Sequence, residues 1–364
     1  MPLYILIAIL MFGVLIALHE FGHFAAAKLC GVKVNEFAIG MGPLLLHRQG
    51  KETEYSLRLF PIGGFCAMEG EEEGRSADPR AFPNRPWWQR LIILLAGVFM
   101  NFLTGFVIIL ILLAPAQGFL TPEISGFSEE VPVLAQNYLK EGDRITRVDG
   151  HTVYLQPDIS FFLGRTGASQ VALEVERDGQ RVTLPAVPLT AVPQSDGSER
   201  LMLGIYMREY EPATVFSRVK YAALECADNV RMVWYSLSEL VRGAVGIRDM
   251  SGPVGIIDMV GQVGEAGAQA AEAAGGSAIL GALENILSFG AFISINLAVM
   301  NLLPIPALDG GQILFMGVNG IYTAITKKKM DPKYLGWVSA AGFACLMALM
   351  LAVTVSDILK QFGV

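Results

Sequence analysis

The chain has few charged residues and few cysteines. Charged side chains make up 17% of the 364 residues and hydrophobic ones 53%, whereas a soluble domain carries about 25% charge. The four cysteines show no C-x-x-C spacing, which argues against a disulfide framework and a cysteine-based zinc site. The net charge of −7 argues against a nucleic-acid binder. This composition indicates a membrane protein.

Four apolar runs reach the length of about 20 residues that a helix needs to cross a bilayer. They cover residues 1–29, 91–115, 284–304 and 335–356. The first run could be mistaken for a cleavable signal peptide. It lacks a basic start and is longer than such peptides, so we interpret it as a transmembrane helix.

The positions of the basic residues predict the orientation of these helices. Nine Lys or Arg residues lie in 28–90, between the first two runs, and Lys327, Lys328, Lys329 and Lys333 lie in the 305–334 connection. Both connections are therefore expected on the cytoplasmic side. The long acidic segment 116–283 and both termini are expected outside.

The first apolar run contains His19-Glu20-Phe21-Gly22-His23, the pattern H-E-x-x-H. On a helix, two histidines four residues apart share one face and can bind one Zn²⁺, with Glu20 beside them as a general base. The alternative is a coincidental match on a soluble helix with surface histidines. The apolar surroundings disfavour that alternative, because ionisable groups in lipid need a partner such as a metal.

A third ligand is needed, and Asp309 directly follows the third apolar run in Asn301-Leu-Leu-Pro-Ile-Pro-Ala-Leu-Asp309-Gly-Gly. Pro304 and Pro306 stop the helix and leave an extended chain, which can turn a carboxylate back toward the metal. The same residues could also form an ordinary helix-ending turn.

Together, the two motifs resemble the site-2 protease family of intramembrane zinc metalloproteases, and most closely its bacterial regulator-of-sigma-E protease branch. The resemblance covers nearly the whole chain. It implies that His19, His23 and Asp309 bind Zn²⁺ and that Glu20 is the catalytic base. It also implies that Asn296 and Asn301 hydrogen-bond an unwound substrate, whose freed backbone groups need partners in lipid.

The same resemblance implies roles for two further segments. Within the region 30–90, residues 36–43 and 54–65 alternate like β-strands broken by glycines. The family implies a membrane-associated hairpin here that pairs with the substrate, with Gly40 and Gly42 in contact with it. The alternative is a simple cytoplasmic hairpin. Residues 96–101 resemble a family element with Val98 in place of the usual proline, and Asn101 is expected only to pack against the active-site bundle.

The outer segment is expected to hold one PDZ domain at 121–190. The stretch Gly142-Asp143-Arg-Ile-Thr-Arg-Val-Asp149-Gly150 matches the PDZ turn and strand, and Asp178-Gly179 predicts a hairpin. Residues 211–283 are expected to form amphipathic helices near the outer membrane surface and a Gly/Ala-rich segment, either linker or helix.

The fold class expected is thus a polytopic α-helical membrane protein with a β-hairpin region and a β-rich PDZ domain. The function expected is intramembrane zinc endopeptidase in the bacterial cytoplasmic (inner) membrane, with the active site toward the cytoplasm. Its substrates would be single-span membrane proteins, such as anti-sigma factors already trimmed by an upstream protease, or signal-peptide remnants. The rivals are a metal transporter or sensor, which needs a path open to both sides, and an inactive scaffold around the PDZ domain.

Overall fold

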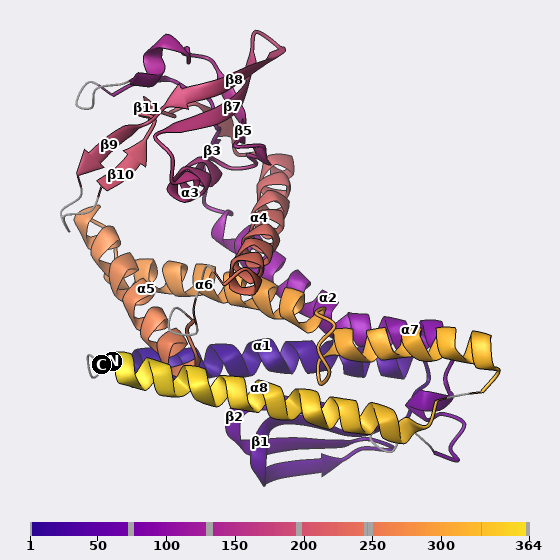
Figure 1. Cartoon of the computed structure of the whole chain (residues 1–364). Coiled ribbons are helices and arrows are strands. Elements are labelled where there is room, and N and C mark those ends of the chain that lie inside the picture. Colours follow the sequence, from indigo (N-terminus) through magenta and orange to yellow (C-terminus); the bar gives the residue numbers. More distant parts are fainter. Residues whose placement is uncertain are drawn as a thin grey trace. The chain divides into compact units, whose positions relative to one another are not determined.

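The computed structural model describes residues 2–71, 76–128, 134–193, 199–243, 246, 250–328 and 330–361. Its contacts divide the chain into two compact units (Figure 1). The helical unit contains Met1–Leu112 and Asn229–Val364, and the β-rich unit contains Leu113–Asp228. Lys329, part of the predicted basic connection, lies outside the described residues.

The four predicted apolar runs are helical: α1 (Pro2–Leu29), α2 (Trp87–Leu112), α6 (Ala278–Asn301) and α8 (Pro332–Gln361). Each is long and apolar enough to cross a membrane, and they are the four such helices in the part of the chain that the structure describes. The unit also contains α5 (Pro253–Ala273) and α7 (Asp309–Thr326). The Gly/Ala-rich segment after residue 261 is therefore mostly helix, and the linker is limited to the residues between α5 and α6.

Helix α1 approaches α2 closely at the level of the H-E-x-x-H motif. A Cβ atom on Gly22 would lie 2.4 Å from the carbonyl oxygen of Ala96. Small residues allow such close contact between helices in lipid, where packing rather than the hydrophobic effect holds helices together. Gly22, the fourth residue of the motif, thus fixes the distance between the two helices.

The predicted hairpin region contains the two long strands β1 (Val34–Gln49) and β2 (Glu54–Met68). Each strand bends at glycines with positive φ: Gly40 and Gly42 in β1 and Gly63 in β2. The bends let one stretch of β1 pair twice, because Phe37 is opposite both Cys66 and Tyr55.

The two bent strands therefore form a four-segment sheet in the order 64–68, 34–39, 54–57 and 44–49, in which the two outer pairs are antiparallel and the register of the central pair is parallel. Residues 64–68 form one edge of this sheet, and 44–49 form the other. Buried side chains from α1, α2, the sheet and the short 3-10 helix η1 (Phe82–Asn84) pack into one core: Ala26, Ala27, Val32, Val34, Cys66, Met68, Phe82, Ile93 and Leu94.

The β-rich unit is built on a four-stranded antiparallel sheet of order β6-β5-β7-β8. The strands are β5 (Arg144–Val148), β6 (His151–Thr152), β7 (Gln170–Arg177) and β8 (Gln180–Pro188), with α3 (Gln156–Thr166) and the 3-10 helix η2 (Leu134–Asn137) beside them. The predicted hairpin at Asp178-Gly179 joins β7 to β8, and both turn residues have positive φ.

This unit extends beyond the predicted limits of 121–190, because later strands pair back onto its start. Strand β12 (Tyr210–Pro212) pairs with β3 (Gly118–Leu120), and β11 (Ile205–Tyr206) pairs with β4 (Gly126–Phe127). Strands β9 (Thr190–Pro193) and β10 (Glu199–Met202) form a hairpin between them, and α4 (Val215–Val241) follows. Residues 129–133 of the predicted PDZ domain lie outside the described residues.

Candidate metal centre

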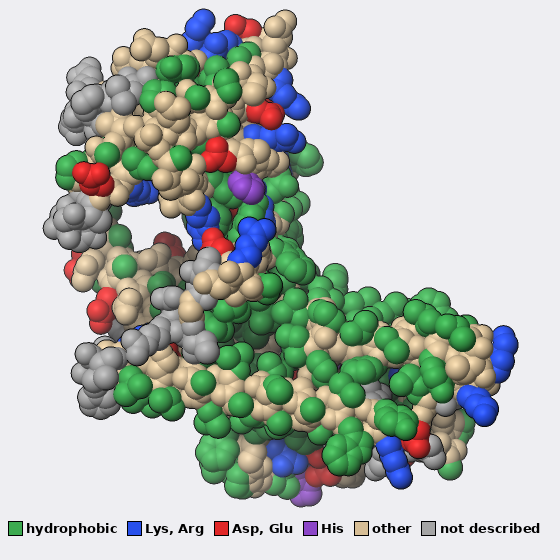
Figure 2. Space-filling view, viewed as in Figure 1, with side chains coloured by type: hydrophobic (Ala, Val, Ile, Leu, Met, Phe, Trp, Pro, Cys, Tyr) green, Lys and Arg blue, Asp and Glu red, His purple; other side chains and the backbone are tan. Residues whose placement is uncertain are grey.

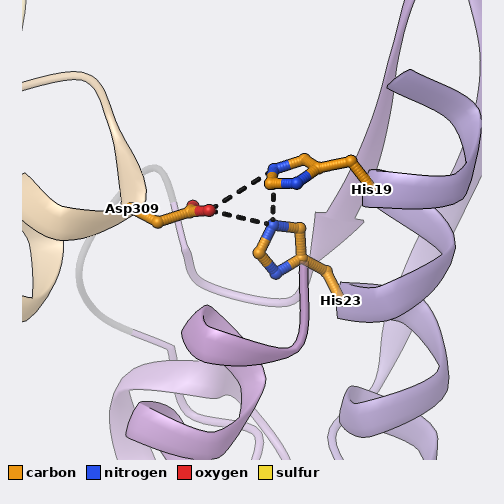
Figure 3. Close-up of side chains that lie close together, drawn as sticks. All are labelled: His19, His23 and Asp309. Atoms are coloured by element: carbon orange, nitrogen blue, oxygen red, sulfur yellow. Dashed lines mark hydrogen bonds and ion pairs between the residues drawn. The ribbon is translucent and has the colours of Figure 1, made fainter. Parts of the chain in front are cut away.

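Three ligand atoms converge inside the helical unit (Figure 3). His19 and His23 lie one turn apart on α1, and Asp309 is the first residue of α7. The Oδ2 atom of Asp309 lies 3.3 Å from His19 Nε2 and 3.4 Å from His23 Nε2. The two Nε2 atoms are 3.2 Å apart. The two histidines, 290 and 286 residues before Asp309 in sequence, therefore form one cluster with it.

The spacing of these three atoms fits a tetrahedral zinc ion. Ligand atoms held about 2.0–2.1 Å from zinc at tetrahedral angles are about 3.3–3.4 Å from one another. The observed separations are 3.2, 3.3 and 3.4 Å. Asp309 Oδ2 is also buried without a hydrogen-bond partner among the described residues. Three protein ligands would leave a fourth position open, as in catalytic zinc sites.

The chain between α6 and α7 brings Asp309 to the histidines. Helix α6 ends at Asn301, and the segment containing Pro304 and Pro306 separates it from α7. Leu308 is extended, and α7 begins at Asp309. Apart from Leu308, the expected extended chain is not observed: residues 302–304, 306 and 307 form turns and bends, and the Leu308 N–H closes a turn onto the carbonyl oxygen of Ile305. This turn leads directly into a new helix that begins at Asp309.

The two glycines after Asp309 allow this segment to fold against the start of α7. A Cβ atom on Gly310 would lie 2.3 Å from the carbonyl oxygen of Leu302, and one on Gly311 would lie 2.2 Å from that of Ile305. Both glycines are buried. The Asp-Gly-Gly sequence is thus required by packing as well as by the carboxylate.

Helix α2 lies directly beside the histidine rings. A Cβ atom on Gly97 would lie 2.4 Å from His23 Nε2 and 2.7 Å from His19 Cε1. One turn earlier, the carbonyl oxygen of Ile93 accepts a hydrogen bond from His23 Nδ1 at 2.8 Å. Metal-binding histidines are commonly oriented by such an acceptor on the second ring nitrogen, which leaves Nε2 free for the metal.

Glu20 is held at the edge of the sheet. Its carboxylate accepts a hydrogen bond from the backbone N–H of Cys66 in the edge segment 64–68. A Cβ atom on Gly64 would lie 3.5 Å from Glu20 Cγ, so the edge strand packs against the base candidate. Glu20 therefore lies between the metal ligands and a strand with a free edge.

A cavity of about 1710 Å³ connects these residues to the connections predicted to be cytoplasmic. The three ligand residues and Glu20 line one part of it. Polar residues from those connections line another part: Asn84, Arg85, Arg90, Asn319 and Asp331. The cavity provides a polar route along which water can reach the site.

The other predicted site residues differ in whether they line the cavity. Asn301 lines the cavity, and its Nδ2 lies 3.4 Å from His19 Nε2. Asn296 is half-buried on α6, outside the set of residues that line the cavity. Gly40 and Gly42 also lie outside that set, at the bends of β1. Contact of Asn296, Gly40 and Gly42 with substrate stays a prediction.

Two residues in the site had no predicted role in it. Asn101, expected only to pack, has its Nδ2 3.3 Å from His19 Nδ1. Glu71 lines the cavity, where burial raises the pKa of its carboxyl to about 7 and the Gln312 amide donates a hydrogen bond to it. In the sequence, the acidic run at 71–73 could have drawn attention to Glu71. No local pattern could have placed Asn101 at the site, because its position there depends on how α1 and α2 pack.

Replacing Gly97 with alanine should displace both histidine rings, because the added methyl group would overlap them. We expect G97A to bind zinc about 10–100-fold more weakly than the wild type, as measured by competition with a chelator. The control is G317A, since Gly317 on α7 has no heavy atom within 4 Å of its Cβ position. Wild-type zinc affinity in G97A would contradict the packing described.

The chain is similar along its length to several bacterial proteins. The model of Peptidase family M50 matches residues 7–349. A protein named as a zinc metalloprotease in Clostridium acetobutylicum is 40% identical, with 97% of each chain covered. A second, from Clostridium perfringens, is 36% identical over 98% of this chain and 99% of its own.

A more distant relative is the regulator of sigma-W protease RasP of Bacillus subtilis, 29% identical over 97% of this chain and 98% of its own. Among solved structures, the PDZ domain of an SdrC-like protein from Listeria monocytogenes matches 23% of this chain and 84% of its own, with 20% identity and a TM-score of 0.20, which carries no weight for the fold. The chain belongs to Peptidase family M50, the site-2 protease family that its motifs resemble, and is a membrane zinc metalloprotease.

Proposed function

We propose that His19, His23 and Asp309 hold the zinc ion and that Glu20 is the general base in hydrolysis of a peptide bond within the membrane. The observation that carries this proposal is the convergence of the three ligand atoms on one point, 3.2–3.4 Å apart, with Glu20 in the same cavity. Helix α1, which carries His19, Glu20 and His23, is long and apolar enough to span a bilayer.

The protein's own residues divide the chemistry between them. When bound, zinc makes a water molecule nucleophilic and polarises the scissile carbonyl group. Glu20 accepts the proton from the attacking water and passes it to the leaving amine. The Cys66 N–H orients the Glu20 carboxylate for this task. Asn301, beside His19, can donate from Nδ2 to the substrate carbonyl oxygen as negative charge develops there.

The free edge of residues 64–68 is suited to bind the substrate as an added strand. The N–H and C=O of one strand residue point to the same edge. Since the Cys66 N–H points to Glu20, its C=O faces the same free edge. Phe65, Ala67 and Met68 line the cavity beside it. A helical substrate that unwinds here would regain backbone hydrogen bonds, which lipid cannot supply.

The proposed orientation places the cavity mouth on the cytoplasmic side and both termini outside. Aromatic side chains are highly exposed at the starts of α2 and α8: Trp87, Trp88, Tyr334 and Trp337. Such residues are enriched where helices meet the membrane surface. Figure 2 shows hydrophobic side chains along α8 and basic ones gathered at the end where α7 and α8 meet. Both features support one cytoplasmic interface at this end.

We propose single-span membrane proteins as the substrates, with anti-sigma factors and signal-peptide remnants as the two classes. The relative named for regulation of sigma-W makes the first class the leading one. An upstream protease would first remove the outer part of the substrate. The β-rich unit, which the sequence identifies as a PDZ domain, would act as a size filter that excludes bulky outer domains.

Replacing Glu20 with glutamine should separate zinc binding from catalysis. We expect E20Q to retain zinc and to lose about 10²–10⁴-fold in cleavage rate, because an amide cannot accept the proton of water. Zinc content and cleavage of a single-span substrate in vesicles are measured together, with D309A as the variant that should lose zinc. Full cleavage by E20Q would contradict the mechanism. If the protein were a zinc transporter, wild type and E20Q would both move zinc across the vesicle membrane.

Substrate bound as a strand should cross-link to the edge segment with a period of two residues. We expect A67C, placed in an E20Q chain without its native cysteines, to form disulfides with alternate cysteines scanned through the substrate. L45C, on the opposite edge of the same sheet, is the control and should give none. A period of three to four residues would show that the substrate stays helical.

Removing the β-rich unit should let the enzyme cut substrates that retain a folded outer domain. Gly118 pairs with Pro212, so a short Gly/Ser linker can replace residues 119–211 with little strain. We expect this variant to keep its zinc and to cleave both trimmed and untrimmed substrate. If untrimmed substrate stays intact while trimmed substrate is cut as before, the size filter lies elsewhere.

A further inference from the structure

Asn101 is buried beside the metal ligands with half of its amide unpaired. The residue lies on α2 and is 1% exposed. Its Nδ2 lies 3.3 Å from His19 Nδ1, and its Oδ1 is buried without a hydrogen-bond partner among the described residues. Buried amide oxygens are nearly always hydrogen-bonded, so this orientation requires an explanation.

The chemistry of His19 provides that explanation. Its Nε2 faces Asp309 and His23, so a metal held there would use the Nε2 lone pair. The neutral ring then carries its proton on Nδ1, which becomes a donor that needs an acceptor. Asn101 Nδ2 is itself a donor, so this orientation sets a donor against a donor. The oxygen and nitrogen of an amide occupy nearly the same volume, and exchanging them is a small change.

We propose that Asn101 is a positioning residue for His19: its Oδ1 accepts the His19 Nδ1–H and fixes the tautomer that presents Nε2 to zinc. This exchange gives the buried oxygen its missing partner. The inference rests on the proposed ligand set. It assigns to Asn101 a role in zinc binding, whereas the sequence predicted packing alone.

His23 has the matching arrangement, which supports the proposal independently. Its Nδ1 donates to the carbonyl oxygen of Ile93 at 2.8 Å. Ile93, Gly97 and Asn101 are spaced four residues apart, so they form one stripe along α2 that faces the histidines. The stripe supplies an acceptor for each ring, and the glycine between them leaves room for both rings.

The α2 backbone at Asn101 is held from the other side by α6. The Ser294 hydroxyl, which is fully buried, donates to the carbonyl oxygen of Asn101 at 2.8 Å. Helix α6 also carries Asn301, whose Nδ2 is near His19 Nε2. The backbone of α2 at Asn101 is therefore held against α6. The Asn101 side chain extends from this fixed backbone to the His19 imidazole.

The test uses the full chain in detergent, with zinc affinity measured by competition with a chelator. Loss of a ring-orienting partner costs about 10–100-fold in metal affinity, and we expect this loss in N101L. We expect N101D to bind zinc within about threefold of wild type or more tightly, because a carboxylate also accepts from Nδ1–H. T104V, one turn along α2, is the control, since the Thr104 hydroxyl donates to the Met100 carbonyl oxygen of its own helix.

The outcomes separate the proposal from its rivals. If N101D loses zinc as N101L does, the amide N–H is the required group, and the proposal is wrong. Unchanged affinity in N101L would also overturn it. H19A tests the ligand set itself: if H19A keeps wild-type zinc affinity, the proposed function fails first.

A second measurement does not depend on the folding of any variant. In zinc-loaded wild-type protein with ¹⁵N-labelled histidine, NMR should show protonated Nδ1 and unprotonated Nε2 on both ligand histidines. A His19 ring that carries its proton on Nε2 would overturn the proposal.

Discussion

The polar groups of this site lie among apolar helices, and that constraint determines most of its structure. In lipid, a polar group without a partner in the protein has none at all. The ligand atoms of His19, His23 and Asp309 converge around a point that fits zinc. The rings are in turn held by Ile93 and Asn101, and Glu20 by Cys66. Both histidines and Glu20 thus have a neighbour that can orient them.

These partners come within reach because helices approach one another closely. Gly22 lets α1 meet the α2 backbone, and Gly97 leaves space for both imidazoles. Gly310 and Gly311 allow the chain before α7 to fold onto the helix that carries Asp309. A bulkier residue at Gly97 would overlap the histidine rings, and one at the other three positions would overlap neighbouring backbone. Small residues in this protein thus serve the geometry of the site.

The sequence predicted what local periodicity determines. The four apolar runs and the shared face of His19 and His23 follow from spacing along a helix, and the prolines before Asp309 indicated a chain that turns back. The contacts of Gly97 and Asn101 depend on the register between α1 and α2, which no local pattern encodes. The sheet order also escaped prediction, because residues 34–39 pair on both sides. The β-rich unit exceeded its predicted limits for a related reason: its last strands pair with its first.

In the proposed function, one hydrogen bond links substrate recognition to catalysis. The Cys66 N–H that orients Glu20 belongs to the edge strand on which we propose the substrate binds. Glu20 is bonded to the backbone of this edge segment. A substrate strand that pairs with the segment would therefore place one of its peptide bonds near Glu20, whatever its side chains. Strand addition reads backbone groups, which all sequences share, so in the proposed function substrates of different sequence could bind in the same way. Selection among substrates would then depend on how readily a helix unwinds and on which outer domains the protein admits.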